Sequence, residues 1–89
     1  MTFDDDNRKA IITRLKRVEG QVRGIQAMID GGADCEKVAQ QLAAARKALD
    51  KAFYEMMACA MRAQMDAAPD LASAQAVAGQ MTRMLARLG

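Results

Sequence analysis

The segment IITRLKRVEGQVRGIQAMI, residues 11–29, carries an apolar residue at every third or fourth position. The members of this apolar line are Ile11, Leu15, Val18, Val22, Ile25 and Ile29. Alternating steps of four and three residues form the a/d seam of a helix that packs lengthwise against another helix. Because Gly31 and Gly32 follow directly, as is common where helices end, we predict a first helix over about residues 6–30.

Two glycines, Gly20 and Gly24, lie inside this helix and off its seam. A glycine in a helix interior costs about 1 kcal/mol relative to alanine. Their presence therefore predicts the close approach of another helix or of a ligand backbone.

The same spacing resumes after a short break and predicts a second helix over about residues 35–66. Its seam consists of Cys35, Val38, Leu42, Ala45, Leu49, Ala52, Met56, Cys59 and Ala63. Asp34 is suited to be its N-cap. A second apolar line beside the seam predicts contact with more than one neighbouring helix. It consists of Phe53, Met57, Ala60 and Met61. Pro69 interrupts the pattern, and a third helix is expected between Leu71 and Leu88.

The composition places the chain in the all-α class, as one domain over residues 1–89. One proline and three aromatic residues are too few for a β sandwich or barrel. At 89 residues a lone hydrophobic core is marginal, and three amphipathic helices cannot cover one another in so short a chain. We therefore expect the first two helices of two chains to form an antiparallel four-helix-bundle dimer, and two dimers to form a tetramer.

Several absences narrow the function. The chain has no histidine, which removes the commonest metal ligand and the usual general base. No carboxylate pair is placed for acid and base work, so we expect no enzyme and no required cofactor. No apolar run reaches the roughly 18 residues of a membrane span, and the acidic residues 4–6 differ from a signal peptide. We expect a cytoplasmic protein without a membrane partner.

Basic residues are concentrated in the first helix, although the net charge is only +2. Six of them lie between Arg8 and Arg23, against one acid, Glu19. Lysine and arginine on a helix bind phosphate oxygens and release counterions, which gives affinity for nucleic acid. The same pattern also suits the solvated face of a coiled-coil helix. Composition leaves two hypotheses open, a DNA-binding protein and a helical oligomer with no DNA role.

The two cysteines are expected far apart on the second helix. Cys35 falls in the first turn, a position that favours a reactive thiolate, whereas Cys59 on the seam also suits a small buried hydrophobe. They are 24 residues apart, about 36 Å in a continuous helix, so they cannot meet within one chain. In an antiparallel dimer, Cys35 of one chain approaches Cys59 of the other. Nearby, Met56, Met57 and Met61 suit a soft-metal site or, more commonly at this spacing, a core.

Two segments and one cysteine form a more specific pattern. The segments are RLKRVEGQVRGI at residues 14–25 and QLAAARKALDK at residues 41–51, and Cys35 lies between them. Together they resemble the CsoR/RcnR/FrmR family of bacterial repressors over nearly the whole chain. The resemblance implies an all-α dimer that pairs into a tetramer and binds operator DNA until its sensing site is filled or modified. It also implies a DNA surface of outward-facing basic residues on the first two helices. By position these are Arg14, Lys16, Arg17, Arg46 and Lys47.

The expected sensing site departs from the metal sensors that the chain resembles. Those sensors combine the helix-start cysteine, matched by Cys35, with a histidine and a further ligand. The corresponding positions here are Ala60 and Gln64. A tyrosine and a glutamate that support the copper site correspond to Asp34 and Gln80. The resemblance therefore leaves one thiolate of the usual donor set, and tight Cu(I) binding normally needs two to four strong donors.

Thiol chemistry needs no histidine. The family that the chain resembles includes persulfide sensors with two cysteines and a formaldehyde-sensing group that uses the helix-start cysteine with the N-terminal amine, here that of Thr2. We predict a repressor released from its operator when a polysulfide or a small electrophile such as formaldehyde modifies Cys35, with the partner's Cys59 resolving the product. The alternative is a repressor that binds Cu(I) or Zn(II) through Cys35 and Cys59 of opposite subunits. That site requires a helix rotation of about 100° or a different subunit register.

Overall fold

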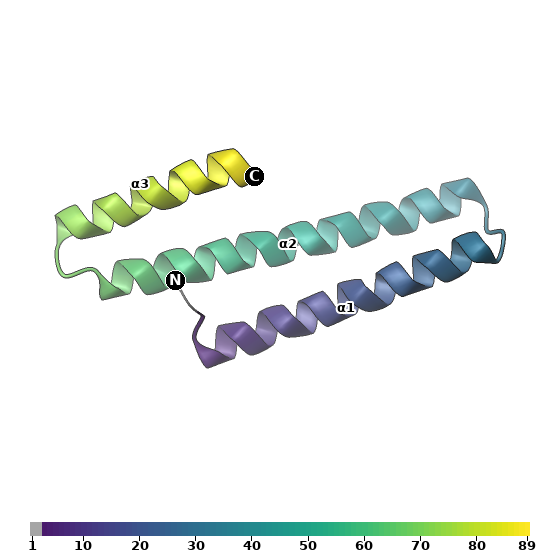
Figure 1. Cartoon of the computed structure of the whole chain (residues 1–89), viewed down its shortest axis with the longest axis horizontal. Helices are drawn as coiled ribbons and strands as arrows, with labels where there is room; N and C mark the ends of the chain where they lie inside the picture. Colours follow the sequence, from purple (N-terminus) through teal and green to yellow (C-terminus); the bar gives the residue numbers. More distant parts are fainter. Residues whose placement is uncertain (1–2) are drawn as a thin grey trace.

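The computed structural model describes residues 3–89, which form three helices. They are α1 (Asp5–Asp30), α2 (Cys35–Ala67) and α3 (Leu71–Leu88). α1 and α2 form a long antiparallel hairpin, and α3 folds back along the other side of α2 (Figure 1). The described residues contain no strand, which confirms the all-α class, and the expected bounds of the first two helices are met to within one residue. None of these helices combines the length and apolar character needed to cross a bilayer.

The turn between α1 and α2 is closed by backbone hydrogen bonds. The N–H of Gly32 donates to the carbonyl of Ile29 at 3.1 Å, and the N–H of Ala33 donates to that of Met28 at 2.9 Å. This pair of bonds is a Schellman motif, in which the residue after the C-cap takes a left-handed conformation. Gly32 supplies that conformation with φ of +78°. The glycines therefore end the first helix as the sequence predicted.

The three helices begin in different ways. Asp4 caps α1 and Asp70 caps α3, each accepting a hydrogen bond of 2.8 Å from a backbone N–H, of Asn7 and Ser73 respectively. The backbone bond from Ser73 lowers the pKa of the Asp70 carboxyl below its ordinary value. Asp34 precedes α2 as expected, but its side chain makes no capping hydrogen bond. The first turn of α2 therefore has no side-chain cap.

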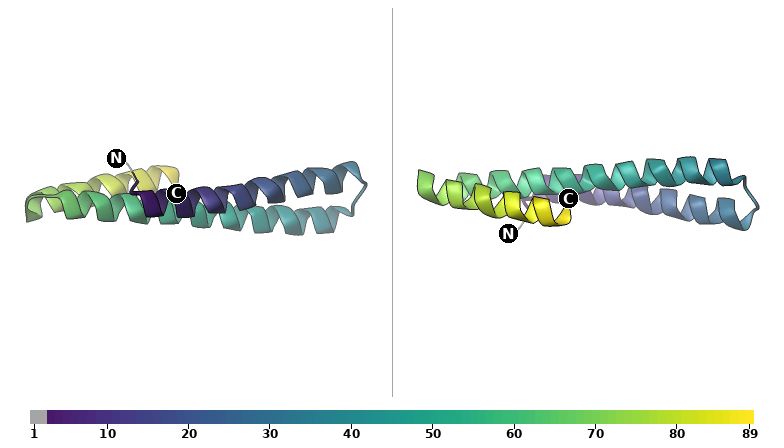
Figure 2. Two further views of the ribbon diagram at one scale, coloured as in Figure 1. Left: turned by 90° about the horizontal axis from the view of Figure 1, so that it is seen from below. Right: turned by 90° about the horizontal axis from the view of Figure 1, so that it is seen from above.

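The described chain is one layer of helices thick, as its two edge-on views show (Figure 2). Its extents are 58 × 27 × 12 Å, and the shortest is close to one helix diameter. The radius of gyration is 17.4 Å, against about 12 Å for a compact chain of this length. The accessible surface is 6594 Å², about 1,500 Å² more than a compact chain of this mass exposes. A single chain therefore leaves much helix surface uncovered, and the bundle dimer and tetramer stay predictions.

The seam of α1 is divided between two directions. Every second member is buried beside α2, and these residues are Ile11, Val18 and Ile25. The members between them are exposed, and these residues are Leu15, Val22 and Ile29. One half of the seam thus joins α1 to α2 within the chain, and the other half has no cover.

The seam of α2 is divided in the same way. Ala45, Ala52 and Cys59, spaced by seven residues, are buried, whereas Leu42 and Leu49 are about half exposed. The buried line consists of small residues, which lets the two helices approach closely. Cys59 occupies the next place in a line of alanines.

A methionine-rich core joins α2 to α3. Its buried members are Met57, Ala60 and Met81. Partly buried residues around them are Phe53, Met56, Met61, Val77 and Met84. The second apolar line of α2 therefore faces α3, which confirms the prediction that this helix contacts more than one neighbour. Five methionines of these two helices belong to this core, whereas Met65 of α2 is exposed.

Gly20 and Gly24 make no close approach to another element within residues 3–89. A Cβ atom added at either position would meet no atom within 4 Å, apart from the backbone of the helix itself. The close contact predicted for these glycines would therefore have to come from a molecule outside the chain.

Candidate functional site

Cys35 is the first residue of α2, at the hairpin end of the molecule, and its side chain is exposed. It lies in an apolar groove of about 440 Å³. The other residues that line the groove are Ile29, Ala33, Val38, Ala39 and Leu42. None of these side chains can donate or accept a hydrogen bond or coordinate a metal. The thiol is therefore open to reagents in solution, with no second donor from the same groove.

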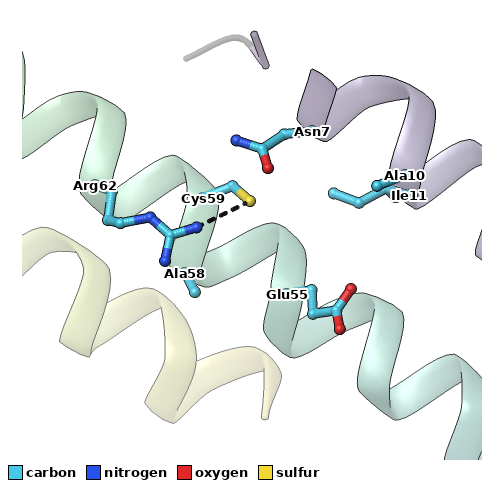
Figure 3. A pocket seen from close by; sticks show the side chains of 7 residues that line it. All are labelled: Asn7, Ala10, Ile11, Glu55, Ala58, Cys59 and Arg62. Carbon is cyan, nitrogen blue, oxygen red and sulfur yellow. Dashed lines mark hydrogen bonds between the residues drawn. The ribbon is translucent and has the colours of Figure 1, made fainter. Parts of the chain in front are cut away.

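Cys59 has different surroundings, because it is 8% exposed and faces α1. Its Sγ accepts a hydrogen bond from Nη2 of Arg62 at 3.6 Å. Asn7 of α1 lies across from these two residues, and Glu55 lies one turn earlier on α2 (Figure 3). Together they line a pocket of about 280 Å³ between the two helices. Cys59 is buried on the seam, as expected for a small hydrophobe at this position, but the guanidinium of Arg62 gives it a polar neighbour.

The two cysteines do not meet within one chain. α2 is continuous through both positions, so Cys35 and Cys59 lie about 36 Å apart. Both thiols are free. Within residues 3–89, no three histidine, cysteine, aspartate or glutamate side chains gather where they could hold a metal ion. Any ligand shared by the two cysteines needs a second chain, as the sequence indicated.

The position that carries a histidine in the metal sensors faces away from Cys59. Ala60 at this position is 5% exposed and packs in the core between α2 and α3. Gln64 is partly buried, and Gln80 lies exposed on α3. Successive helix positions differ by about 100° in direction, so Cys59 and Ala60 point to different helices. Cys59 therefore does not take the histidine's place within the single chain.

Four of the five predicted DNA-binding residues are exposed and make no ion pair in the described part of the chain. They are Lys16, Arg17, Arg46 and Lys47. Arg14 differs from the expected outward orientation, because its Nε lies 2.5 Å from Oε2 of Glu55 on α2 and its side chain is 34% exposed. Arg14 thus links the basic helix to a residue of the Cys59 pocket.

Three polar residues of this pocket were not predicted as site residues. Glu55 and Arg62 stand four positions before and three positions after Cys59, a spacing that puts them on its face of the helix. That signal is present in the sequence. Asn7 could not be found in this way, because its place depends on the register of α1 against α2.

The architecture and these residues define a class, a helical regulator with exposed basic residues and free thiols. Residues 7–87 match the model of the metal-sensitive transcriptional repressors, and the chain belongs to this family. Membership confirms the family resemblance and the expectation of a regulator that is not an enzyme. Because transcriptional repressors act on DNA, it also favours DNA binding over a helical oligomer with no DNA role.

Two curated relatives show how far the similarity extends. The chain is 46% identical over 47 residues to the copper-sensing transcriptional repressor CsoR of Bacillus subtilis, an alignment that covers 53% of this chain and 46% of that protein. It is 26% identical over 68 residues to an uncharacterized protein in the bioA 5' region of Serratia marcescens, covering 76% of this chain and 75% of the relative. No solved structure matches the chain.

Proposed function

We propose that this chain is a DNA-binding repressor that leaves its operator when Cys35 is covalently modified. Membership in a repressor family supports the first half of the proposal. One combined observation carries the second half. Cys35 is exposed, and Ala60, at the position where the metal sensors have a histidine, is buried in the core. One open thiol without a neighbouring strong donor is suited to attack an electrophile.

Reaction with a hydropolysulfide is one form of this step. The Cys35 thiolate attacks one sulfur of HS–SH, the S–S bond breaks and HS⁻ leaves, so that the cysteine carries a persulfide, Cys–S–SH. Attack by the thiolate of the partner's Cys59 on the inner sulfur then releases HS⁻ and forms a disulfide between the chains. Because Cys59 is buried beside α1, this second step requires the helices to move. A small aldehyde adds to the same Cys35 thiol, and Thr2, whose amine would take part in that reaction, lies outside the described residues.

The test measures fluorescence anisotropy of an operator selected by the protein from random DNA. Because Cys35 is exposed and Cys59 is buried, polysulfide should release the wild-type protein at a concentration that leaves Cys35→Ala bound. Cys59→Ala is the matched control, since it keeps the reactive thiol and removes only the resolving one. Release of Cys35→Ala at the concentration that releases the wild type would refute the trigger.

The proposed DNA surface consists of the five basic residues on α1 and α2. They are Arg14, Lys16, Arg17, Arg46 and Lys47. Each phosphate contact adds about 0.9 to the slope of log affinity against log salt concentration. A steep salt dependence that decreases when these residues are replaced supports this surface.

We further propose that a second copy of the chain covers the exposed half of the seams. The roughly 1,500 Å² of excess surface exceeds the about 800 Å² that each partner buries in an interface of standard size. A groove of about 260 Å³, lined by Leu15, Leu49 and Phe53 among others, offers room for apolar side chains of the second copy. An antiparallel four-helix-bundle dimer covers this groove. The exposed Leu71 and Leu88 of α3 are available for pairing two dimers into a tetramer.

A metal-responsive repressor is the second candidate, because the family model is described as metal-sensitive and one relative is named as copper-sensing. The site would join Cys35 of one chain and Cys59 of the other around Cu(I) or Zn(II). Titration in competition with a chromophoric chelator tests it. Tight binding that Cys59→Ala abolishes favours this candidate, and micromolar or weaker binding excludes a sensor of this kind.

A further inference from the structure

The Cys59 pocket contains a charge that nothing in its lining neutralises. The Arg62 guanidinium has five N–H donors, of which one is directed at Sγ of Cys59 at 3.6 Å. Glu55 is the only acid that lines the pocket, and it is held by Arg14 at 2.5 Å. No carboxylate pairs with Arg62 in the described part of the chain. The pocket therefore presents a net positive group beside a thiol.

Among the described residues, no carboxylate lines the α1 side of the pocket. Asn7 faces the pocket from α1 (Figure 3). Its amide nitrogen donates to Oδ2 of Asp4 at 2.9 Å. The same carboxylate accepts the backbone N–H of Asn7 at 2.8 Å, so Asp4 is engaged at the helix start. Asp4 does not line the pocket. An anion next to Arg62 would therefore meet the Asn7 amide and the Glu55 carboxylate, whose charge Arg14 balances.

The volume of the pocket suits a small molecule. About 280 Å³ corresponds to roughly nine water molecules at about 30 Å³ each. Ala10 and Ile11 supply an apolar wall on the α1 side. A short chain of sulfur atoms with a charged end fits this space.

We propose that the pocket of Asn7, Glu55, Cys59 and Arg62 is a second thiol site, complete within one chain, that takes a small anionic sulfur electrophile, a polythionate or a hydropolysulfide. With tetrathionate, the Cys59 thiolate attacks one of the two central sulfurs and the central S–S bond breaks. Thiosulfate leaves with the electron pair of that bond, and Cys59 carries an S-thiosulfate group. Arg62 binds the anionic end of the reagent and holds the retained sulfonate in the product.

This site is coupled to the DNA surface through one residue, a step that rests on the proposed DNA-binding function. Glu55 lines the pocket and also holds Arg14, one of the proposed phosphate ligands. An anionic group added at Cys59 places negative charge beside Glu55 and bulk between α2 and the start of α1. Both changes move α1 relative to α2 at the turns that carry the basic residues. Modification of Cys59 therefore weakens operator binding.

The experiment uses Cys35→Ala, in which Cys59 is the only thiol. Three reagents are added separately: tetrathionate, sodium disulfide at a pH where it is anionic, and the neutral reagent methyl methanethiosulfonate. Mass spectrometry follows the formation of the adduct at Cys59. Arg62→Gln should slow the anionic reagents about tenfold, the effect of losing one charge-assisted hydrogen bond, and should change the neutral reagent little. Arg62→Lys should restore much of the rate. Far-UV circular dichroism confirms that each variant keeps its helices.

The results separate the two proposals. The anionic reagent with the larger dependence on Arg62 identifies the ligand class, and equal effects of Arg62→Gln on anionic and neutral reagents overturn the site. Operator binding by the modified Cys35→Ala protein should fall relative to the unmodified protein, and unchanged binding overturns the coupling. If Cys59→Ala is still released by polysulfide, the Cys35 trigger stands whatever happens at Cys59. Release of Cys35→Ala but not of Cys59→Ala would assign the trigger to Cys59 instead.

Discussion

Two valines of α1 provide a matched test of how the seam is divided. Val18 and Val22 stand one turn apart near the middle of the helix, yet Val18 is 8% exposed and Val22 is 42% exposed. We predict that Val18→Ala weakens the packing of α1 on α2 within the chain, whereas Val22→Ala weakens association between chains. The gain in helix propensity on changing valine to alanine is the same at both positions, so it cancels in the comparison.

The expected magnitudes follow from burial. Each substitution removes two methyl carbons, worth about 0.8 kcal/mol each when fully buried. At Val18 nearly the whole of this, about 1.6 kcal/mol, is lost within each chain, and a residual cavity adds to it. At Val22 only the 42% that remains exposed can be covered by a partner, which gives about 0.7 kcal/mol per chain and about 1.4 kcal/mol per dimer. That is about tenfold in the dimer dissociation constant.

Sedimentation equilibrium measures the dissociation constant, and thermal unfolding at protein concentrations far above it measures the stability of the folded assembly. Val22→Ala should weaken association about tenfold, whereas Val18→Ala should change the dissociation constant little and act on the melting temperature of the assembly. Two results would refute the reasoning. One is an unchanged dissociation constant for Val22→Ala, and the other is an equal loss of association in both variants.

Three further predictions test other parts of the molecule. Replacing Gly20 or Gly24 by alanine should raise the stability of the chain by up to about 1 kcal/mol in urea unfolding, because no other element of the described chain comes within 4 Å of the added Cβ. Weaker DNA binding in either variant would identify DNA as the close neighbour. The pKa of Asp70 is lowered in the folded chain, so its cap should contribute fully to the stability of the folded chain above about pH 3.9 and lose this contribution as the pH falls further. The chemical shift of the Ser73 amide should follow this titration in the wild type and not in Asp70→Asn. Lys16→Ala should reduce the salt slope of operator binding by about 0.9, measured by anisotropy between low and moderate salt, and an unchanged slope would remove this residue from the DNA surface.

The helices could be predicted from the sequence because their signals are local. The three-and-four spacing sets the face and length of α1 and α2, and Gly32 is needed for the left-handed residue that ends α1. Capping was predicted less well. Asp34 looks like an N-cap but makes no side-chain bond, whereas Asp4, in an acidic run, does cap its helix. Whether a carboxylate turns back to an N–H depends on the loop conformation before it, which residue type alone does not determine.

The environment of the two cysteines required the structure. Both lie on one apolar seam in the sequence, and the spacing cannot say which half of a seam is covered within the chain. The register of the hairpin decides this, since it buries Cys59 in line with two alanines and leaves Cys35 exposed beside the last turn of α1. The polar side of the Cys59 pocket also depends on this register, because Asn7 comes from the other helix.

The ion pair between Arg14 and Glu55 is compatible with the proposed place of Arg14 on the DNA surface. Its side chains are 34% and 36% exposed, and a pair with this much solvent access contributes about 1 kcal/mol or less. A phosphate at the surface offers Arg14 a contact of similar strength together with the entropy of a released counterion, so DNA competes with Glu55 for the guanidinium. Because the two states of Arg14 are close in free energy, a small change in the charge near Glu55 shifts the balance between them. Glu55 also lines the Cys59 pocket, and chemistry at that thiol therefore reaches the basic helix through a single carboxylate.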